Sequence, residues 1–485
     1  MANVLASLAG PAKPRSADWG GKAVLVFALA LLMAIPGAFV FALVADREHR
    51  ADTVTGEVSS LQGGPQQLLG PLLIAPYSIP APPPAPGAAA ADPTTGWYVV
   101  SPVEGQTRVD LKGTTLHRSI FDVPVYEAQA HIQARFAPPP KDLDLPKNAT
   151  VDWSHAQIVM GLSDLRGAKS DIVGAFTGAA GRTSVAFSPA SGLDLGTPKI
   201  PPNPEGRVVS DNSAPQFGLV TAPAAAIVAS PTGGVFDVSL RFTGAQRLGL
   251  LPFAKSTTAQ VAGDWAAPSF DGGFLPETRQ TAGKTFTAAW SVPFIARGLS
   301  DSGPSGALSL EQLGAKDLGV TFVPASNPYS SVIRALKYAV MFVGLVFLTF
   351  FVFEALSGRR LHPAQYLMIG FAQMVFYLLL LSLSEYVGFD WAFAGAATGT
   401  VGLIGLYAGA AFRSRVYQVQ ALIIFSIVYG LIYLLMRLDD FALLAGSLAS
   451  FVGLSLAMYL TRDIDWYGGK AEAAKPEPAP AAAAV

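Results

Sequence analysis

Cysteine is absent from the 485 residues of the chain, and charged residues make up only 14% of it. Without cysteine no disulfide can form, so a domain outside the cytoplasm must be stable through the burial of apolar side chains alone. The formal net charge is −1, and no long basic run occurs. Because binding to nucleic-acid phosphates requires a dense cationic face, the composition predicts no nucleic-acid partner.

Motifs for catalysis and for metal or cofactor binding are also missing. The histidines His117, His131 and His155 lack the spacing of a metal site such as HxxxH. The chain contains no GxSxG, SxxK or phosphate-binding glycine loop. The sequence therefore predicts no metal site, no cofactor and no catalytic residues, and we interpret the chain as a non-enzyme.

Long apolar runs dominate both ends of the chain. The run 23–45 is uncharged and long enough to cross a hydrocarbon core of about 30 Å as a helix that Pro36 could kink. A cleaved signal peptide is the alternative, but its apolar core would be only about 7 to 15 residues long. Five similar runs make up a predicted membrane bundle at 332–461, namely 332–356, 364–383, 391–412, 419–436 and 441–460. Six transmembrane helices are expected, with the lipid bilayer as partner.

Lysines and arginines indicate how these helices are oriented. Basic residues precede the first span and then follow every second span: Lys13, Arg15, Lys22, Arg359, Arg360, Arg413, Arg415, Arg462 and Lys470. Because such residues stay preferentially in the cytoplasm, both the N-terminal segment 1–22 and the disordered tail 462–485 are expected there. The segment 46–331 is then extracytoplasmic, which means periplasmic in a bacterium with two membranes. The expected location is the inner membrane.

The segment 46–331 has the pattern of a β-rich domain. Apolar residues alternate with polar or small ones over 121–136 and again over 236–242. Many glycines and prolines separate such runs, and helical periodicity is weak after 47–61. We expect an antiparallel, sandwich-like β domain, in one part or two, large enough to fold without disulfides. The proline-rich stretches 80–93 and 138–140 are expected to be loops.

Several strings resemble a known family. They are GGPQQLLGPLLIAPY at 63–77, HRSIFDVPVYEAQ at 117–129, VMGLSDLRG at 159–167, DWAAPSFDGGFLP at 264–276, and the membrane segments 334–354 and 362–385. With these strings in this order over roughly 46–459, the chain resembles the CreD family of bacterial inner-membrane proteins, also described as cell-envelope integrity proteins. The resemblance implies a link to envelope stress, β-lactam response and colicin tolerance under a two-component regulator. It implies no enzymatic mechanism.

Two glutamates in the membrane spans are candidate functional residues, since ionisable groups are costly there. Glu354 lies near the cytoplasmic end of its span, within reach of an ion pair with Arg359 and Arg360. Glu385 lies near the periplasmic end of the next span, where it can reach headgroups or loop cations. Interfacial anchoring is the alternative role for each. The family usually has a histidine after Glu385, and Tyr386 in its place weakens any proton-handling role of that pair.

Neutral polar and small residues mark two further helix faces. Gln365, Gln373 and Tyr377 share a face of one span, consistent with hydrogen bonds between helices. The fourth span has GxxxG-type spacings, which predict close packing of helices and a bundle core that runs through it: Gly395, Gly399, Gly402, Gly405 and Gly409. The same spacings permit a homo-oligomer, and that alternative stays open.

In the outer domain, Asp264, Asp271 and Glu277 cluster around Trp265 and Phe270. A sugar-binding or glycosidase site could use such a grouping, and a turn-rich loop would also produce it. Trp265, Phe270 and Asp271 are therefore candidate partner-binding residues.

A second string of the outer domain, SDLRG, also suggests local structure. Asp164 and Arg166 within it predict a tight turn with a local ion pair.

Three functional hypotheses follow. The first is a non-enzymatic inner-membrane protein whose β-rich domain supports or senses envelope integrity, with cell-wall or envelope components or other membrane proteins as candidate partners. The second is a transporter or flippase for an envelope component, and the third is a membrane-tethered periplasmic hydrolase. Charges at the centre of a span would favour the second, and a nucleophile motif the third. Both are missing from the sequence.

Overall fold

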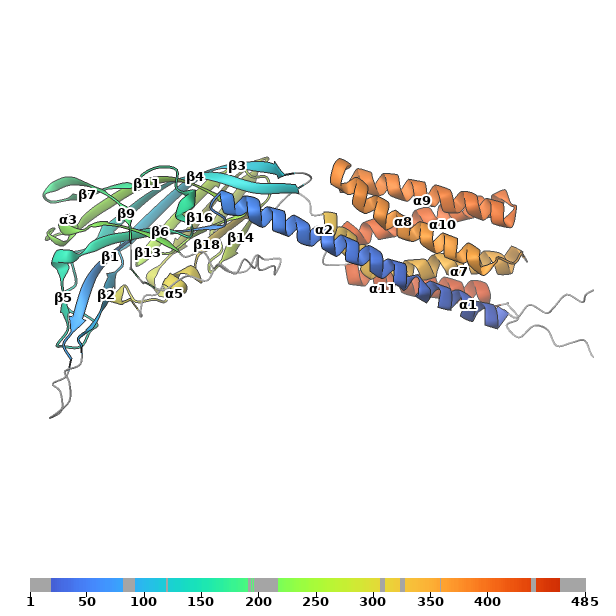
Figure 1. The fold of residues 1–485 in the computed structure, drawn as a ribbon, viewed down its shortest axis with the longest axis horizontal. Helices are drawn as coiled ribbons and strands as arrows, with labels where there is room; N and C mark the ends of the chain where they lie inside the picture. Colours follow the sequence, from blue (N-terminus) through green and yellow to red (C-terminus); the bar gives the residue numbers. More distant parts are fainter. Residues whose placement is uncertain are drawn as a thin grey trace, which may run out of the picture. The chain divides into compact units, whose positions relative to one another are not determined.

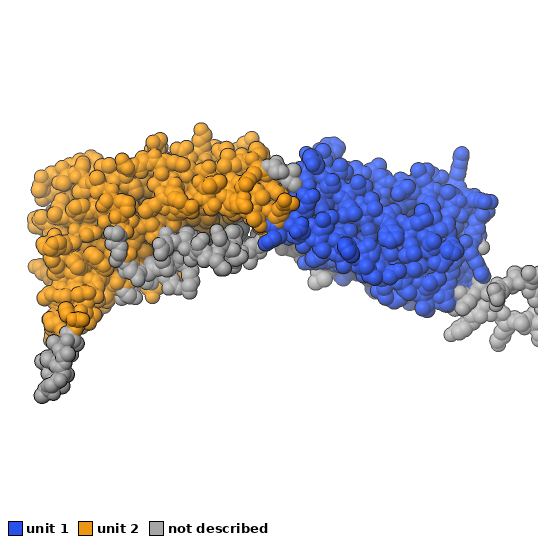
Figure 2. Space-filling model, in the orientation of Figure 1, with its two compact units in different colours: residues 1–49, 326–485 blue, residues 50–325 orange. Residues whose placement is uncertain are grey.

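A computed structural model describes residues 19–81, 92–118, 121–190, 193, 195, 217–305, 310–322, 328–357, 359–437 and 442–462. The chain forms two compact units, shown in Figure 2. The membrane unit is Met1–His49 with Ser326–Val485, and the β unit is Arg50–Ala325. The ribbon in Figure 1 shows the first unit as helices and the second as strands.

The first apolar run forms the helices α1 (Trp19–Leu32) and α2 (Ala34–Leu61). Pro36 explains the break between them, because a proline has no N–H to donate to the carbonyl of Leu32 four residues earlier. Together the two helices make a helical segment of 43 residues, Trp19–Leu61, which contains an apolar stretch long enough to cross a membrane. α2 ends at the last residue of the stretch 47–61 whose periodicity predicted a helix.

In the part of the chain that the structure describes, six further helices belong to the membrane unit, and the last four of them follow the predicted spans closely. They are α6 (Pro328–Lys337), α7 (Ala339–Ser357), α8 (Pro363–Val387), α9 (Phe389–Phe412), α10 (Arg415–Arg437) and α11 (Ala442–Thr461). The predicted span 332–356 is wrong as one helix, because the chain breaks at Tyr338, where no glycine or proline indicated it. Within the described residues, five helical segments are long and apolar enough to cross a membrane. α11 lies within a residue of the predicted last span at each end, but it is not among these five segments. The count of six transmembrane helices therefore stays a prediction.

The glycines of α9 differ in how closely a neighbouring helix approaches them. A Cβ on Gly405 or Gly409 would collide with Leu422 or Gln418 of α10, so these two glycines permit the close helix packing that was predicted. A Cβ on any of the other three would meet nothing within 4 Å: Gly395, Gly399 and Gly402. The prediction that the glycines place α9 at the core of the bundle is therefore right for only part of them.

The β unit contains two sheets. The first has ten strands in the order β14-β18-β12-β1-β6-β10-β9, with β2 and β5 beside β1 and β17 beside β2. Its strands are β1 (Gln66–Ile79), β2 (Thr94–Val100), β5 (Thr150–Val151), β6 (Gln157–Leu162), β9 (Ser188–Pro189), β10 (Gly218–Pro223), β12 (Arg247–Leu250), β14 (Pro268–Gly272), β17 (Ser302–Pro304) and β18 (Leu318–Phe322).

The second sheet has eight strands in the order β15-β16-β13-β3-β4-β11-β7-β8. They are β3 (Glu104–Arg118), β4 (Phe121–Phe136), β7 (Val173–Gly178), β8 (Gly181–Ala186), β11 (Gly234–Ala245), β13 (Ser256–Gly263), β15 (Thr278–Ala282) and β16 (Thr285–Val292). Most pairs are antiparallel, but β1 with β12 and β13 with β3 are parallel. Short helices join the strands: η1 (Trp153–His155), η2 (Leu165–Gly167), α3 (Ala225–Val228), α4 (Phe294–Arg297) and α5 (Leu310–Gly314).

Both sheets contribute to one apolar core, which confirms the sandwich-like fold in a single unit. The alternating pattern of β4 changes phase between Val125 and Tyr126, and the structure explains why. Val123 and Val125 pack with Val58 of α2 in a small separate cluster, whereas Tyr126 belongs to the main core. Successive side chains point to opposite faces of a strand. The face that carries Val123 and Val125 packs against α2, and the opposite face, which carries Tyr126, packs in the main core.

The predicted loops lie partly outside the described residues. The triplet 138–140 lies in irregular structure between β4 and β5, as predicted. Residues 82–91 of the stretch 80–93, and residues 463–485 of the predicted tail, lie outside the described part of the chain.

Candidate functional site

Glu354 lies at the centre of the first of two ionic clusters in the membrane unit. Its side chain is fully buried on α7 and forms an ion pair with Lys22 of α1. The other carboxylate oxygen accepts a hydrogen bond of 3.0 Å from the hydroxyl of Tyr366 on α8. Lys22 also donates to the carbonyl oxygen of Leu361 at 2.9 Å. We call Lys22, Glu354 and Tyr366 the first clasp.

The predicted pairing of Glu354 with Arg359 and Arg360 is wrong. Both arginines follow the end of α7 and are exposed, while the buried carboxylate faces Lys22 from a helix 332 residues away in sequence. A buried carboxylate is stable only when a cation and hydrogen bonds compensate for its lost hydration. The first clasp provides both kinds of partner.

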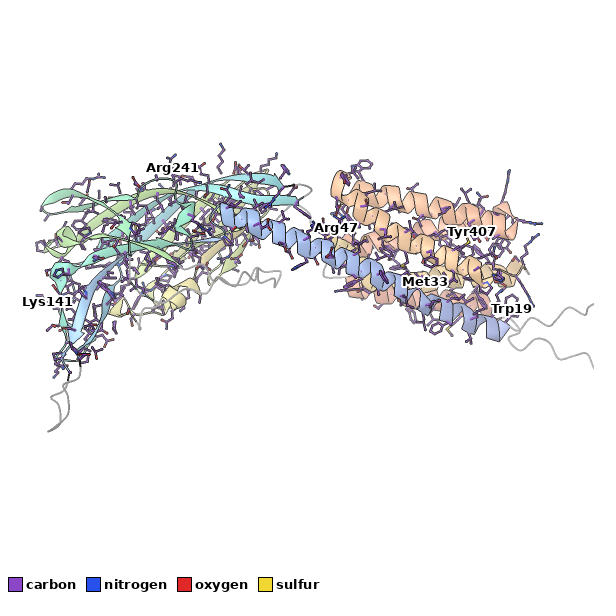
Figure 3. All side chains as sticks on the ribbon, viewed as in Figure 1. Trp19, Met33, Arg47, Lys141, Arg241 and Tyr407 are labelled. Carbon is purple, nitrogen blue, oxygen red and sulfur yellow. The ribbon has the colours of Figure 1, made fainter. Side chains whose placement is uncertain are left out.

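Glu385 lies in the second cluster. Its carboxylate on α8 accepts a hydrogen bond of 3.1 Å from the hydroxyl of Tyr329 on α6. Arg47 of α2, labelled in Figure 3, lies 3.9 Å from the same oxygen. The side chain of Glu385 is 8% exposed and that of Arg47 is 41% exposed. We call Arg47, Glu385 and Tyr329 the second clasp. The predicted contact of Glu385 with a cation is thus a contact with Arg47.

The two clasps hold opposite ends of the first span. Lys22 and Arg47 are separated by about 37 Å along a helix, which exceeds the roughly 30 Å of a hydrocarbon core. Between them, Met33 at the break packs so closely against α8 that a Cβ on Gly370 would overlap its side chain. The first span is therefore fixed to the bundle near both ends and in its middle.

The neutral polar residues of α8 have different roles. Gln365 accepts a hydrogen bond of 2.8 Å from the backbone N–H of His362 and so caps the start of the helix. It contributes a capping box, a local role in place of the bond between helices that was predicted. Gln373 and Tyr377 are buried near the middle of α8.

Arg247 is a buried cation of the β unit that meets two carboxylates. From β12 its guanidinium binds both oxygens of Asp317 at 2.7 and 2.9 Å and an oxygen of Asp271 on β14 at 2.7 and 2.9 Å. Burial lowers the pKa of Arg247, but the contacts with Asp317 and Asp271 outweigh it and hold this pKa above its usual value. Gln67 donates to Asp317 at 2.8 Å. We call Arg247, Asp271 and Asp317 the arginine cluster.

Glycines make room for the arginine cluster. Gly319 of β18 lies opposite Gly249 of β12 and opposite Asp271 of β14. A Cβ on Gly319 would overlap both Asp271 and Arg247, and one on Gly249 would overlap Asp317. The charged groups thus occupy the space that side chains at these two positions would fill.

The acidic and aromatic residues that suggested a binding surface do not form one site. The carboxylate of Asp264 accepts from the backbone N–H of Gly113, and that of Asp271 belongs to the arginine cluster. Phe270 packs against Phe286 and Trp290 with ring centroids 6.1 and 6.0 Å apart.

Trp265, the other aromatic candidate, packs in the same way. Its ring meets Phe322 edge-on with centroids 5.6 Å apart. The structure gives both aromatic candidates a role in the core, and it gives Asp271 a role in an internal ion pair.

A serine, a histidine and an aspartate do meet in the β unit, at η1. Asp152 accepts from the backbone N–H of Ser154 at 3.0 Å, and its other oxygen lies 2.5 Å from Nδ1 of His155. The hydroxyl of Ser154 lies 3.3 Å from that same Nδ1. In a hydrolytic triad, serine and aspartate bind opposite nitrogens of the ring. The arrangement here caps a short helix, and hydrogen bonds from Ser154 and His155 lower the pKa of Asp152 to about 2.

Comparison with known proteins defines the family. A model described as "Inner membrane protein CreD" matches residues 19–467. The chain belongs to the CreD family. It is 27% identical over 469 residues to the inner membrane protein CreD of Escherichia coli (strain K12), which covers 92% of this chain and 93% of that protein. Membership and the apolar helices together make it a multi-pass inner-membrane protein.

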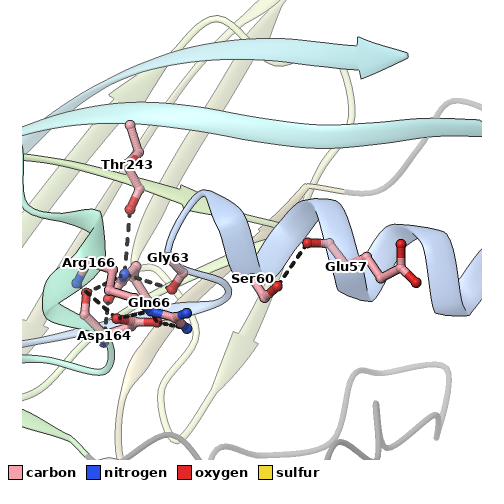
Figure 4. Close-up of polar contacts among 7 residues, drawn as sticks. All are labelled: Glu57, Ser60, Gly63, Gln66, Asp164, Arg166 and Thr243. Carbon is pink, nitrogen blue, oxygen red and sulfur yellow. Dashed lines mark hydrogen bonds and ion pairs between the residues drawn. The ribbon is translucent and has the colours of Figure 1, made fainter. Parts of the chain in front are cut away.

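Two strings that carried the resemblance to CreD meet at Gln66, as Figure 4 shows. The side-chain amide of Gln66 donates to the carbonyl oxygens of Gly63 and Asp164 at 2.8 and 3.0 Å, and its oxygen accepts from the N–H of Asp164 at 3.2 Å. Arg166 forms an ion pair with Asp164 at 2.6 Å, which confirms the predicted turn. A Cβ on Gly167 would overlap Gln66 and the carbonyl oxygen of Thr243. These contacts join GGPQQLL and SDLRG into one structural node.

Sequence reasoning missed the cations of these clusters. Lys22 counted only as an indicator of orientation, and neither Arg47 nor Arg247 carried a motif. Arg297 was missed too, although its side chain is fully buried and donates to Ser101 Oγ at 3.2 Å and to the carbonyl oxygen of Phe253 at 3.4 Å. Burial lowers the pKa of Arg297 to about 10. Within the described residues, no group of three or more potential metal-ligating side chains comes together.

Proposed function

We propose that this member of the CreD family is a non-enzymatic protein that supports or senses the integrity of the cell envelope, with its β unit in the periplasm. The observation that carries the proposal is the use of its buried charges. Glu354 and Glu385 hold the first span to the bundle, and Asp271 pairs with Arg247 inside the β unit. Such pairs suit an anchored domain that binds or supports other envelope components.

The distribution of basic residues supports a periplasmic β unit with both termini in the cytoplasm. A reporter that is active only in the periplasm, fused after Tyr77 or after Arg360, tests this orientation. Activity is expected after Tyr77 alone. Activity after Arg360 would overturn the orientation and with it the proposed location of the β unit.

The proposed role is tested in a strain that lacks this protein, with dye uptake and detergent sensitivity as measures of the envelope defect. The full chain is compared with residues 46–331 attached to an unrelated single helix, whose folding is checked by resistance to protease. Restoration by both is expected. A deletion strain with no envelope defect that the full chain restores would overturn the proposal.

A second candidate, a transporter or flippase, is favoured by the polar side chains on the buried face of α8, including Gln373 and Tyr377. The same experiment separates the two functions. Restoration by the full chain but not by the folded, tethered domain would show that the bundle itself acts, and would favour transport.

A further inference from the structure

A small cavity lies between α7, α8 and α10 in the membrane unit. Gln373 and Tyr377 line it from near the middle of α8, and Tyr429 lines it from α10. The rest of the lining consists of apolar side chains of α7 and α10. The cavity measures about 10 Å³, which is close to the smallest space that holds one water molecule.

The polar atoms of this cavity lack partners. Gln373 is 4% exposed, and its Oε1 accepts no hydrogen bond. Among the residues that the structure describes, neither the hydroxyl of Tyr377 nor that of Tyr429 has a hydrogen-bond partner, although the two side chains are 2% and 3% exposed. A buried polar group without a partner is costly, and the cost is larger where neither water nor headgroups can reach it.

We propose that this cavity is a binding site for a single water molecule inside the bundle. The water donates a hydrogen bond to Oε1 of Gln373, and its second proton and lone pairs serve the hydroxyls of Tyr377 and Tyr429. Three polar partners match the two to four that buried waters use. The inference is independent of the proposed envelope role, because it concerns only the interior of the bundle.

Size and polarity together select the ligand. A molecule larger than water does not fit a space of about 10 Å³, and an apolar occupant would leave Oε1 of Gln373 unpaired. Cavities that stay empty in proteins are lined by apolar side chains alone. This one has an amide and two phenols on its walls, so it is expected to be wet.

The direct test uses the full chain in lipid nanodiscs with isotopically labelled glutamine. Solid-state NMR measures transfer of magnetisation from water protons to the side chain of Gln373, whose signal is assigned by its loss in Gln373→Met. Transfer is expected at a rate typical of an ordered water in contact with the amide. Absence of transfer, with the exposed Gln420 giving a strong signal in the same sample, would overturn the proposal.

Thermal unfolding of Gln373→Met is a second test, because the substitution is expected to change the Tm in opposite directions for a cavity that holds water and for a dry one. If the cavity holds water, the substitution removes a ligand of that water, and the Tm of the membrane unit falls by about 2–4 °C, the shift that about 1 kcal/mol produces in a unit of roughly 150–250 residues. If the cavity is dry, the substitution removes an unpaired acceptor and the Tm rises, which would contradict the proposal. Gln420→Met is the matched control, and its Tm is expected to stay unchanged.

A shared water molecule would also couple the effects that substitutions of its ligands have on stability. Gln373→Met and Tyr429→Phe each remove one partner of the same molecule, so the double variant is expected to lose less stability than the sum of the two. Additive effects would mean that no shared ligand joins the two side chains, and would count against the site.

Discussion

In the membrane unit, buried carboxylates lie near the ends of helices, and each meets a cation from the first span. In the β unit, the buried ion pairs of Arg247 lie within a sheet, where this one arginine is shared by Asp271 of β14 and Asp317 of the turn before β18. The difference reflects the solvent around each unit. A lipid-facing bundle can keep charge near its two water interfaces, whereas a large sandwich can enclose a fully bonded cluster.

The two kinds of ion pair also differ in which parts of the chain they connect. The clasps join segments far apart in sequence and so fix which helices are neighbours. The arginine cluster joins β12, β14 and the turn before β18, and both β12 and β14 already pair with β18 through backbone hydrogen bonds. We therefore expect the clasps to determine helix arrangement and the arginine cluster to determine the stability of one edge of a sheet.

The largest effect is expected for Arg247→Met. It leaves Asp317, which is fully buried, and Asp271 without their cation, and the free energy of unfolding is expected to fall by about 3–5 kcal/mol. Thermal unfolding of the full chain in detergent, followed by circular dichroism, measures the change. Arg279→Met, at an exposed position of β15, is the control, and an equal effect of the two substitutions would contradict a special role of the cluster.

Lys22→Met tests the first clasp. Lys22 is 18% exposed and Glu354 is fully buried, so loss of this charged hydrogen bond is expected to cost about 2–3 kcal/mol. Adding Glu354→Gln is expected to restore part of the stability, because a neutral amide needs no counter-charge. The exposed Lys337→Met is the control in the same unfolding assay. A double variant less stable than Lys22→Met alone would show that the carboxylate does not depend on Lys22.

The second clasp is expected to contribute less. Tyr329→Phe removes one hydrogen bond to Glu385 and is expected to cost about 1 kcal/mol. Arg47→Met is expected to cost about 0.5 kcal/mol, because the ion pair is long and its arginine is half-exposed. Tyr386→Phe, on a side chain that is 77% exposed, serves as the control. A larger loss for Arg47→Met than for Lys22→Met would reverse the ranking of the two clasps.

The smallest effect concerns Asp152, outside both the clasps and the arginine cluster. Its pKa is lowered from 3.8 to about 2, so it binds its proton less readily in the folded chain than in the unfolded one. Its contribution to stability is therefore complete above pH 3.8 and is lost as the pH falls through about 2. NMR titration of labelled aspartate carboxyls in the full chain measures this pKa. Replacing Ser154 and His155 by alanine is expected to return it towards 3.8, and an unchanged value would refute the stated cause.

Much of the local structure was predictable because local patterns encode it. The alternation at 121–136 predicted β4 with its bounds, and the last four apolar runs predicted α8 to α11 to within a few residues. The break at Tyr338 was not predictable, since nothing in the sequence there prevents a continuous helix. The phase change in β4 was visible in the sequence, but its cause required the position of α2 against Val123 and Val125.

The candidate residues show the same division. Sequence singled out Glu354 and Glu385 because a carboxylate in a membrane span is costly wherever its partner lies. It also singled out Phe270 and Asp271, whose neighbours in the sequence suggested a surface, whereas both are engaged within the β unit. A cluster of residues along the chain is not a cluster in space when alternate side chains of a strand point in opposite directions.

The sequence by itself determined which segments are apolar enough for the membrane, which alternate as strands, and to which family the chain belongs. These properties depend on neighbouring residues or on the order of whole strings. Only the tertiary structure decided that Lys22 pairs with Glu354 and Arg47 with Glu385, and that Arg247 joins Asp271 to Asp317. Nothing in the spacing of residues more than 300 positions apart indicates contact, because such pairs form only when packing brings their helices together.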